Sequence, residues 1–267
     1  MFKYFHFTIL IIILFYLSIL LIMFFFQRSF MYHPSSKNYI PEKITFNYEE
    51  IFIPVNSEIS LKSWSTNIHQ NQKTILFFHG NAGDLDARIY KLNAFNDLGI
   101  NFLIISWRGF SGNQGKPTEK GLYEDANSAV KWLNQKGIKN ENIILYGESL
   151  GTGIAIELSS KNNFGGVILE SPYTSMVDMG KKFYPFLPVS LMQRDRYNSI
   201  KKIKKITSPI LILHGKADNL VPFYMGAKLF DEANEPKSSY FPTFDGHMMK
   251  YDEGMKKNLE NFIKSLP

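Results

Sequence analysis

The chain has 267 residues, no cysteine and a formal net charge of +6. Its length fits one folded domain with a short appendage, and the lack of cysteine excludes disulfides, thiolate metal ligands and a cysteine nucleophile. The positive excess is mostly scattered lysine, without zinc-finger spacing, an RNA-binding signature or a basic–aromatic motif, so we expect no nucleic-acid partner.

The first segment has the composition of a membrane span. Residues 4–26 contain no Asp, Glu, Lys or Arg, and a helix of this length extends over roughly 30 Å, the thickness of a bilayer's hydrocarbon core. The stretch is too long for a cleaved signal peptide and runs into Phe26 and Gln27 without a small-residue cleavage site. We therefore expect residues 1–30 to be a retained single-pass anchor and residues 31–267 to form one folded domain.

The orientation of this anchor follows only weakly from its flanks. Lys3 and the amino terminus lie on one side and Arg28 on the other, so the positive-inside rule finds no decisive asymmetry. Single anchors with little preceding chain often leave the amino end inside. This usual orientation of single anchors favours a folded domain on the non-cytoplasmic side of the membrane.

After a polar linker over residues 33–43, apolar runs of strand length recur along the chain. The first two, residues 44–55 and 59–64, alternate partly between apolar and polar residues and predict an antiparallel pair. Later runs are continuously apolar, as in parallel strands buried on both faces. These runs cover residues 74–78, 100–105, 142–146, 167–169 and 210–213.

Helical patterns separate these runs. The clearest has Leu122, Ala126, Ala129 and Leu133 on one face, after a capping Thr118. Another follows Ser149, and a last amphipathic helix is predicted over residues 250–264. Alternating strands and helices predict an α/β fold with a mostly parallel sheet covered on both faces, in which chemistry lies at the carboxyl ends of the strands.

A nucleophile elbow follows one of these strands. The sequence Gly147-Glu-Ser149-Leu-Gly151 has the form G-x-S-x-G and lies between a predicted strand and a predicted helix, the context that its mechanism requires. The tight turn presents the serine hydroxyl at a helix N-terminus. We therefore predict Ser149 as the nucleophile.

A serine needs a base, and in this chain order the acid and then the histidine follow it. Of the two later histidines, His214 ends a strand and is expected to bond locally, so His247, before the last helix, is the predicted base. Asp218, just after the strand at residues 210–213, is the predicted acid. Asp245 is the rival, and Asp178 and Asp195 are weaker candidates.

The tetrahedral intermediate needs two backbone N–H donors. One is the residue after the nucleophile, Leu150. The second is expected from the loop after the strand at residues 74–78, where Asn81 is the choice and Ala82 the alternative. His79 in the same loop is expected to be structural.

Taken together, these segments resemble the α/β-hydrolase superfamily. The matching pieces are H-G-N-A-G from His79, G-E-S-L-G from Gly147, H-G-x-x-D-x-x-V-P from His214 and the late G-H that ends at His247. With the stretch over residues 117–126, they most resemble the superfamily's single-anchor membrane subgroup, which includes protein depalmitoylases. The resemblance covers nearly all of the chain after residue 30.

Two departures concern the surroundings of the site. Where the subgroup usually has D-Y-R-G-Y-G-x-S, this chain has S-W-R-G-F-S-G-N over residues 106–113, which puts the shape of the pocket, but no triad member, in question. Residues 172–207 interrupt the alternation and predict a small cap. Its apolar stretch over residues 183–189 suits an acyl chain, and its lysines at 201–205 suit anionic headgroups or simply a solvated face.

The sequence therefore predicts a serine hydrolase that cleaves ester or thioester bonds through an acyl-serine intermediate, on lipid-like or acylated substrates near a membrane. No metal or organic cofactor is expected, and the partners expected are a small-molecule or acylated-protein substrate and the membrane. The alternatives are a peptidase or acyltransferase of the same fold, because the triad does not select its acceptor, or a non-catalytic membrane-bound binding protein. The sequence does not indicate the oligomeric state.

Overall fold

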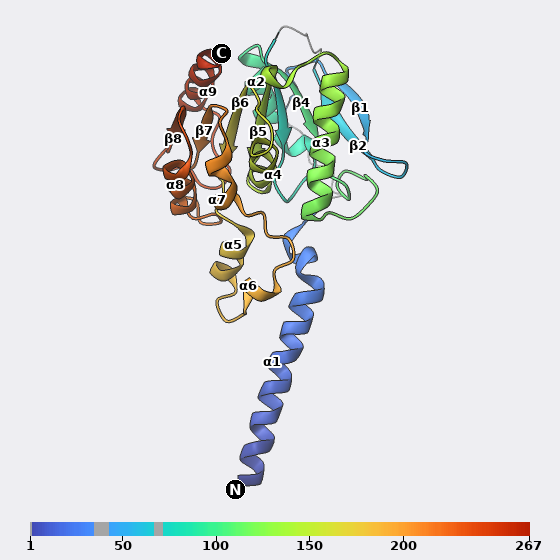
Figure 1. The fold of residues 1–267 in the computed structure, drawn as a ribbon, viewed down its shortest axis with the longest axis vertical. Coiled ribbons are helices and arrows are strands. Elements are labelled where there is room, and N and C mark those ends of the chain that lie inside the picture. Colours follow the sequence, from blue (N-terminus) through green and yellow to red (C-terminus); the bar gives the residue numbers. More distant parts are fainter. Residues whose placement is uncertain (1, 35–42, 67–71) are drawn as a thin grey trace.

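A computed structural model describes residues 2–34, 43–66 and 72–267 of the chain. Most of the predicted linker over residues 33–43 lies outside the described residues. The described residues form a layered α/β body from which one long helix projects (Figure 1).

The centre of the body is a mixed sheet of eight strands in the order β1-β2-β4-β3-β5-β6-β7-β8. Strands β1, β2 and β4 pair antiparallel, and all other neighbours pair parallel. This confirms the predicted fold class and the opening antiparallel pair. The strands are β1 Glu49–Pro54, β2 Ser60–Ser65, β3 Thr74–Phe78, β4 Asn101–Ile105, β5 Ile143–Glu148, β6 Gly166–Glu170, β7 Ile210–Leu213 and β8 Lys237–Tyr240.

Helices cover both faces of the sheet, and every residue of β3, β5, β6 and β7 is buried between them. In β3, for example, Leu76 and Phe78 pack into one apolar cluster with α3, α4 and α8, whereas Ile75 and Phe77 pack into another with α2 and α9. Successive strand side chains point to opposite faces, so a continuous apolar run supplies both clusters. These helices are α2 Ile89–Asp97, α3 Glu119–Gln135, α4 Leu150–Ser159, α8 Phe223–Glu232 and α9 Glu253–Ser265.

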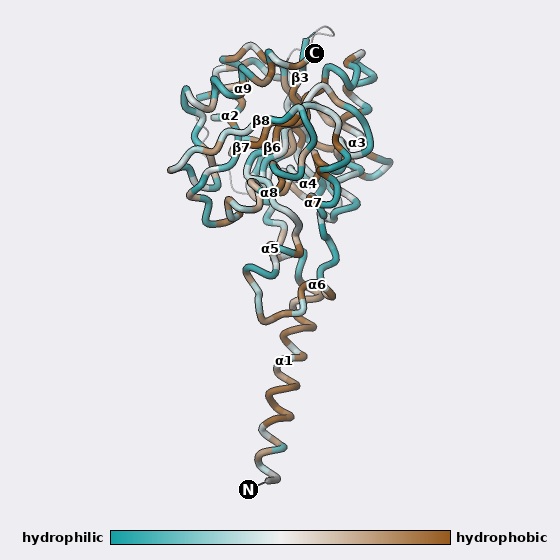
Figure 2. The backbone as a smooth tube through the Cα atoms, turned by 60° about the vertical axis from the view of Figure 1, so that its left-hand side comes forward, coloured by the Kyte–Doolittle hydropathy of each residue, from teal (hydrophilic) through white to brown (hydrophobic). Residues whose placement is uncertain are grey.

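Helix α1, Phe2–Met31, projects away from this body (Figure 1). Its part from Tyr4 to Met31 has a mean hydropathy of 3.2 in its most apolar window, none of which is buried. The helix is apolar along most of its length (Figure 2). By length and composition it is able to cross a membrane.

The segment that connects β6 to β7 is called the cap below. It contains α5 Met176–Phe183, α6 Val189–Met192 and α7 Ser199–Lys202. Helices α5 and α6 lie beside the last turns of α1, whereas α7 lies against the body (Figure 1). The cap lysines at 201–205 lie in α7 and in the turn after it, and Lys202 and Lys204 pair with Glu157 and Glu232.

Candidate active site

The turn after β5 places Ser149 at the start of α4. Ser149 has φ +50° and ψ −113°, a strained conformation for a residue with a side chain. Close packing forces the turn, since a Cβ at Gly151 would lie 1.9 Å from the carbonyl oxygen of Phe78 and one at Gly147 would lie 2.6 Å from that of Gly151. The glycines of the motif therefore let the helix approach β3 and hold the serine in place.

The structure brings the three predicted triad residues together. His247 Nε2 lies 3.0 Å from Ser149 Oγ, and His247 Nδ1 lies 2.8 Å from Asp218 Oδ2. The three side chains come from the β5–α4 turn, the loop after β7 and the loop before α9, so they meet at the carboxyl edge of the sheet. This arrangement allows a proton to pass from serine to histidine while the carboxylate orients the imidazole.

Hydrogen bonds keep Asp218 ionised. Its Oδ1 accepts the N–H groups of Leu220 and Val221, both at 2.8 Å. Burial alone would raise the pKa of Asp218, but hydrogen bonds from His214 and His247 lower that pKa well below its usual range. His214 also bonds the carbonyl of Val221 at 3.0 Å, the local role expected for it.

The rival acids have other partners. Asp245 Oδ2 accepts the N–H of Lys250 at 3.0 Å and thereby closes the loop that carries His247. Asp178 accepts the hydroxyl of Thr174. Asp195 pairs with an arginine at the end of α1, described below.

The loop after β3 provides the second candidate donor for an oxyanion. Asn81 lines the same pocket as Ser149 and Leu150. Within the described part of the chain, the backbone N–H groups of Asn81 and Leu150 have no hydrogen-bond partner, so both remain available to a ligand. His79 is fully buried, and this burial, with the nearby Arg88, lowers its pKa to about 3, so it stays neutral and structural.

A buried network behind the elbow did not emerge from the sequence. Glu148, the x before Ser149, accepts the N–H of Gly80 at 3.1 Å and a hydrogen bond from Arg88 at 2.6 Å. Lys91 is fully buried and binds both Glu148 and Glu170. Burial would raise the pKa of Glu148, but the cations Arg88 and Lys91 hold it well below its usual value. Glu148 thus connects the nucleophile turn to the loop that carries Asn81.

The departures over residues 106–113 are accommodated away from the pocket. Trp107 Nε1 donates to the carbonyl of His79 at 3.1 Å, and Arg108 binds the buried Asp125. No residue of this stretch is among the described residues that line the pocket.

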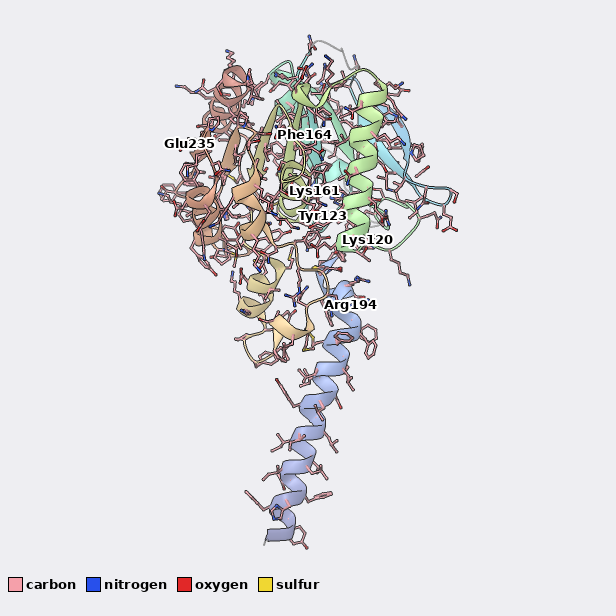
Figure 3. All side chains as sticks on the ribbon, in the orientation of Figure 1. Lys120, Tyr123, Lys161, Phe164, Arg194 and Glu235 are labelled. Atoms are coloured by element: carbon pink, nitrogen blue, oxygen red, sulfur yellow. The ribbon has the colours of Figure 1, made fainter. Side chains whose placement is uncertain are left out.

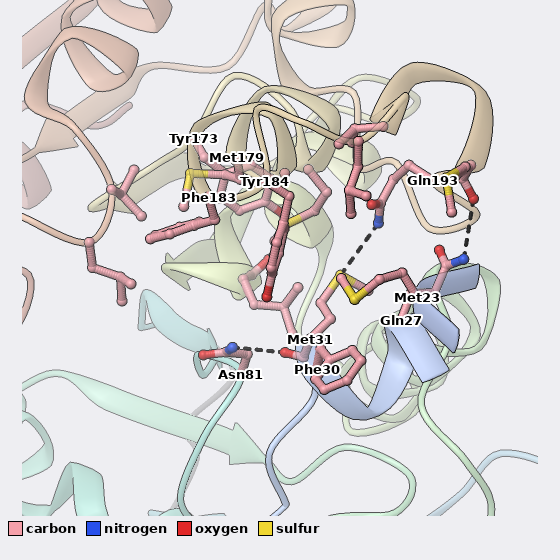
Figure 4. A pocket seen from close by; sticks show the side chains of 18 of the residues that line it. Met23, Gln27, Phe30, Met31, Asn81, Tyr173, Met179, Phe183, Tyr184 and Gln193 are labelled. Carbon is pink, nitrogen blue, oxygen red and sulfur yellow. Dashed lines mark hydrogen bonds between the residues drawn. The ribbon is translucent and has the colours of Figure 1, made fainter. Parts of the chain in front are cut away.

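Beside Ser149 lies a pocket of about 320 Å³. Its walls are mainly apolar and come from α1, the cap and the loop after β7 (Figure 4). Residues from each of these parts include Met23, Phe30, Met179, Phe183, Leu187 and Leu220. The described residues contain no cluster of His, Asp or Glu suited to a metal ion.

Comparisons with known proteins agree with this architecture. A family model described as alpha/beta hydrolase fold matches residues 73–199. Protein bem46 of Schizosaccharomyces pombe is 31% identical over 213 residues, which cover 75% of this chain and 70% of that protein. Alpha/beta hydrolase domain-containing protein 17B of Homo sapiens is 36% identical over 182 residues, or 65% of this chain and 60% of that protein. Among solved structures, an esterase from Pyrococcus furiosus has a TM-score of 0.70 at 22% identity, covering 88% of this chain and 98% of the esterase.

The chain therefore belongs to the α/β-hydrolase fold family, which confirms the resemblance seen in its motifs. It spans 58 to 60% of the full length of three of the curated relatives it matches. At 22% identity, the similarity to the esterase structure is evidence for the shared fold alone.

Proposed function

We propose that this protein is a serine hydrolase that cleaves ester or thioester bonds of acylated or lipid-like substrates. The observation that carries the proposal is the continuous hydrogen-bonded chain from Ser149 through His247 to Asp218. The apolar pocket beside Ser149 supports an acyl group as the part of the substrate that is bound.

In the proposed reaction, Ser149 Oγ attacks the acyl carbonyl carbon while His247 Nε2 takes the hydroxyl proton. The N–H groups of Leu150 and Asn81 bind the oxyanion. The intermediate collapses, the bond to the leaving alkoxide or thiolate breaks, and His247 returns the proton to that group. Water then attacks the acyl-serine with His247 again as base, which releases the carboxylic acid and restores Ser149.

We also propose that α1 crosses a membrane once and holds the domain at its surface. Its length, its hydropathy and the exposure of its apolar side chains support this location. A helix coated with Leu, Ile and Phe on all sides has its lowest free energy in lipid.

The test uses the full chain in detergent with a fluorophosphonate probe and p-nitrophenyl esters. We expect the probe to label the wild type and the wild type to hydrolyse the esters. The Ser149→Ala variant should show neither labelling nor hydrolysis. A folded wild-type protein that takes no label and hydrolyses no ester would instead point to a binding protein without activity.

A further inference from the structure

One wall of the pocket beside Ser149 is the end of α1. Met23, Gln27, Phe30 and Met31 face the pocket from α1, opposite the cap (Figure 4). The same end of α1 also contacts the proposed oxyanion loop, because Asn81 Nδ2 donates to the carbonyl of Met31 at 2.8 Å. The helix is therefore part of the site as well as a tether.

The cap follows one face of α1 well beyond the pocket. Tyr16 Oη donates to the carbonyl of Phe186 at 2.9 Å, and Gln27 Nε2 donates to the carbonyl of Met192 at 3.2 Å. Residues three and four apart share a helix face, and the half-buried residues of α1 keep this spacing. They include Ile19, Leu20, Met23, Gln27 and Met31.

This contact sets the depth of the cap relative to a bilayer. The apolar stretch of α1 ends at Phe26, ten residues after Tyr16. At about 1.5 Å per residue the two lie about 15 Å apart along the helix, which is half of a hydrocarbon core of about 30 Å. If α1 spans the membrane as proposed, the part of the cap bonded to Tyr16 lies within one leaflet.

The composition of this part suits lipid. The cap tip, defined as residues 183–192, contains no charged residue and is bordered by Lys182 and Arg194. Phe186 and Leu191 are 61% and 86% exposed, although both are large and apolar. Arg194 lies over the ring of Phe24, near the end of the apolar stretch of α1 (Figure 3), where a cation reaches the headgroups.

The backbone N–H groups of the cap tip are also mostly absent or bonded within the protein, as a location in lipid requires. Irregular backbone in lipid requires its polar groups to be bonded within the protein. Two residues of the tip are prolines, Pro185 and Pro188, which have no N–H to satisfy. Within the tip, the backbone N–H groups of Tyr184, Leu187, Val189, Leu191 and Met192 are bonded to nearby carbonyls.

We propose that the cap tip is immersed beside α1 in the leaflet nearest the body, and that the pocket between them is a port through which one long, unbranched acyl chain passes from the bilayer to Ser149. A volume of about 320 Å³ lies at the low end of small-molecule pockets, about 300–1,000 Å³, and suits a single chain. The inference rests on the proposed function for the bond that reacts.

Immersion is tested with thiol labels, which the cysteine-free chain accepts at single positions. Phe186→Cys and Leu191→Cys variants of the full chain carry an environment-sensitive fluorophore in phosphatidylcholine vesicles. Phe52→Cys is the control, because Phe52 is 60% exposed on β1 in the body. We expect nitroxides on lipid acyl chains to quench the two cap labels but not the control, and aqueous iodide to do the opposite. Cap labels that iodide quenches as strongly as the control would overturn immersion.

Occupancy is tested by protection from alkylation in mild detergent, with hexadecanoate as the probe. Met23→Cys places a thiol in the pocket, and Phe25→Cys places one two residues along α1, at a position that is 67% exposed and does not line the pocket. At about ten times its Kd, hexadecanoate should slow alkylation of the Met23→Cys variant by about tenfold and leave the Phe25→Cys variant unchanged. Equal rates with and without hexadecanoate at both positions would overturn the port.

These readouts separate the port from the hydrolase activity, because neither depends on turnover. Protection of the Met23→Cys variant in a chain that hydrolyses no ester would support the port and end the proposed function. Hydrolysis of long-chain esters without protection would support the hydrolase and overturn the port.

Discussion

At the residue scale, Ser149 has a strained backbone conformation that places its hydroxyl beside His247. Its positive φ is fixed by β5 before it and α4 after it, and its Oγ lies 3.0 Å from His247. Substitution by alanine keeps the backbone and removes only the attacking atom. We expect Ser149→Ala to lower turnover of p-nitrophenyl butyrate by about four to six orders of magnitude without changing the circular dichroism spectrum. A variant that keeps a tenth of the wild-type activity would remove Ser149 from the nucleophile role.

The two nearby aspartates provide a matched comparison. Asp218 bonds His247 Nδ1, whereas Asp245 bonds the backbone N–H of Lys250, which asparagine is also able to accept. Asp218→Asn should lower kcat by about 10⁴, because an amide favours the wrong imidazole tautomer. Asp245→Asn should have little effect in the same ester assay. The reverse order of losses would identify Asp245 as the acid.

At the scale of elements, the buried network joins β5, β6 and α2 behind the elbow. Glu148 is 3% exposed and has two cationic partners, Arg88 and Lys91. Removing its charge leaves the two buried cations with Glu170 as their one remaining carboxylate partner among these residues. We expect Glu148→Gln to lower the free energy of unfolding by about 3–5 kcal/mol, as for other broken buried pairs.

The pH dependence of this loss follows from the lowered pKa of Glu148. A carboxylate whose pKa is lower in the folded state stabilises the fold above its unfolded pKa of about 4.3, and this stabilisation disappears as the pH falls through the folded value. The difference between wild type and Glu148→Gln should therefore be full at neutral pH and shrink only in acid. Urea unfolding over a pH series measures it, and a difference that grows in acid would contradict the assigned charge state.

The sequence predicted the strands that are buried on both faces and the opening antiparallel pair, but it missed the polar edge strand. The apolar runs of β3, β5, β6 and β7 are continuous and easily recognised, whereas β8, Lys237–Tyr240, is a polar edge strand without such a run. The elbow was predictable because its motif is local. The Glu148 network was not, because its partners lie 57 to 68 residues away along the chain.

At the scale of the whole molecule, the least predictable feature is the contact of α1 with the cap. A helix that is apolar on every side has no periodicity to reveal which face packs against protein. The partners are also remote, as in the hydrogen bond from Tyr16 to Phe186. The apolar helix was recognisable from composition alone, but its place in the pocket required the fold.

An ion pair connects the end of α1 to the cap segment beside the body. Arg28 binds both carboxylate oxygens of Asp195, at 2.7 and 3.0 Å, and Asp195 is 4% exposed. Tyr32 bonds the same carboxylate and the hydroxyl of Tyr197. These contacts fix the last turn of α1 over the pocket. The long apolar segment and the pocket wall are therefore consecutive parts of one helix.

Two truncations should separate tether from wall. Deleting residues 2–15 leaves an apolar stretch of 11 residues, 16–26, too short for a bilayer that needs about 20, but it keeps Tyr16, Met23 and Arg28. In detergent micelles this protein should hydrolyse a hexadecanoyl ester as the full chain does, while failing to stay with vesicles. Deleting residues 2–30 removes the pocket wall contributed by Met23, Gln27 and Phe30.

The longer truncation should keep hydrolysis of p-nitrophenyl butyrate, because Ser149, His247 and Asp218 all lie in the remaining body. Its kcat/KM for the hexadecanoyl ester in micelles should fall much further than its kcat/KM for the butyrate. Burial in the pocket stabilises a bound acyl chain by about 0.8 kcal/mol per methylene, and the long chain loses more of this stabilisation when the wall is removed. Circular dichroism checks that both truncated proteins fold. If both lose long-chain hydrolysis in micelles to the same extent, residues 2–15 matter for more than membrane attachment. If neither loses it, the cap and the body alone form the acyl site and α1 acts only as a tether.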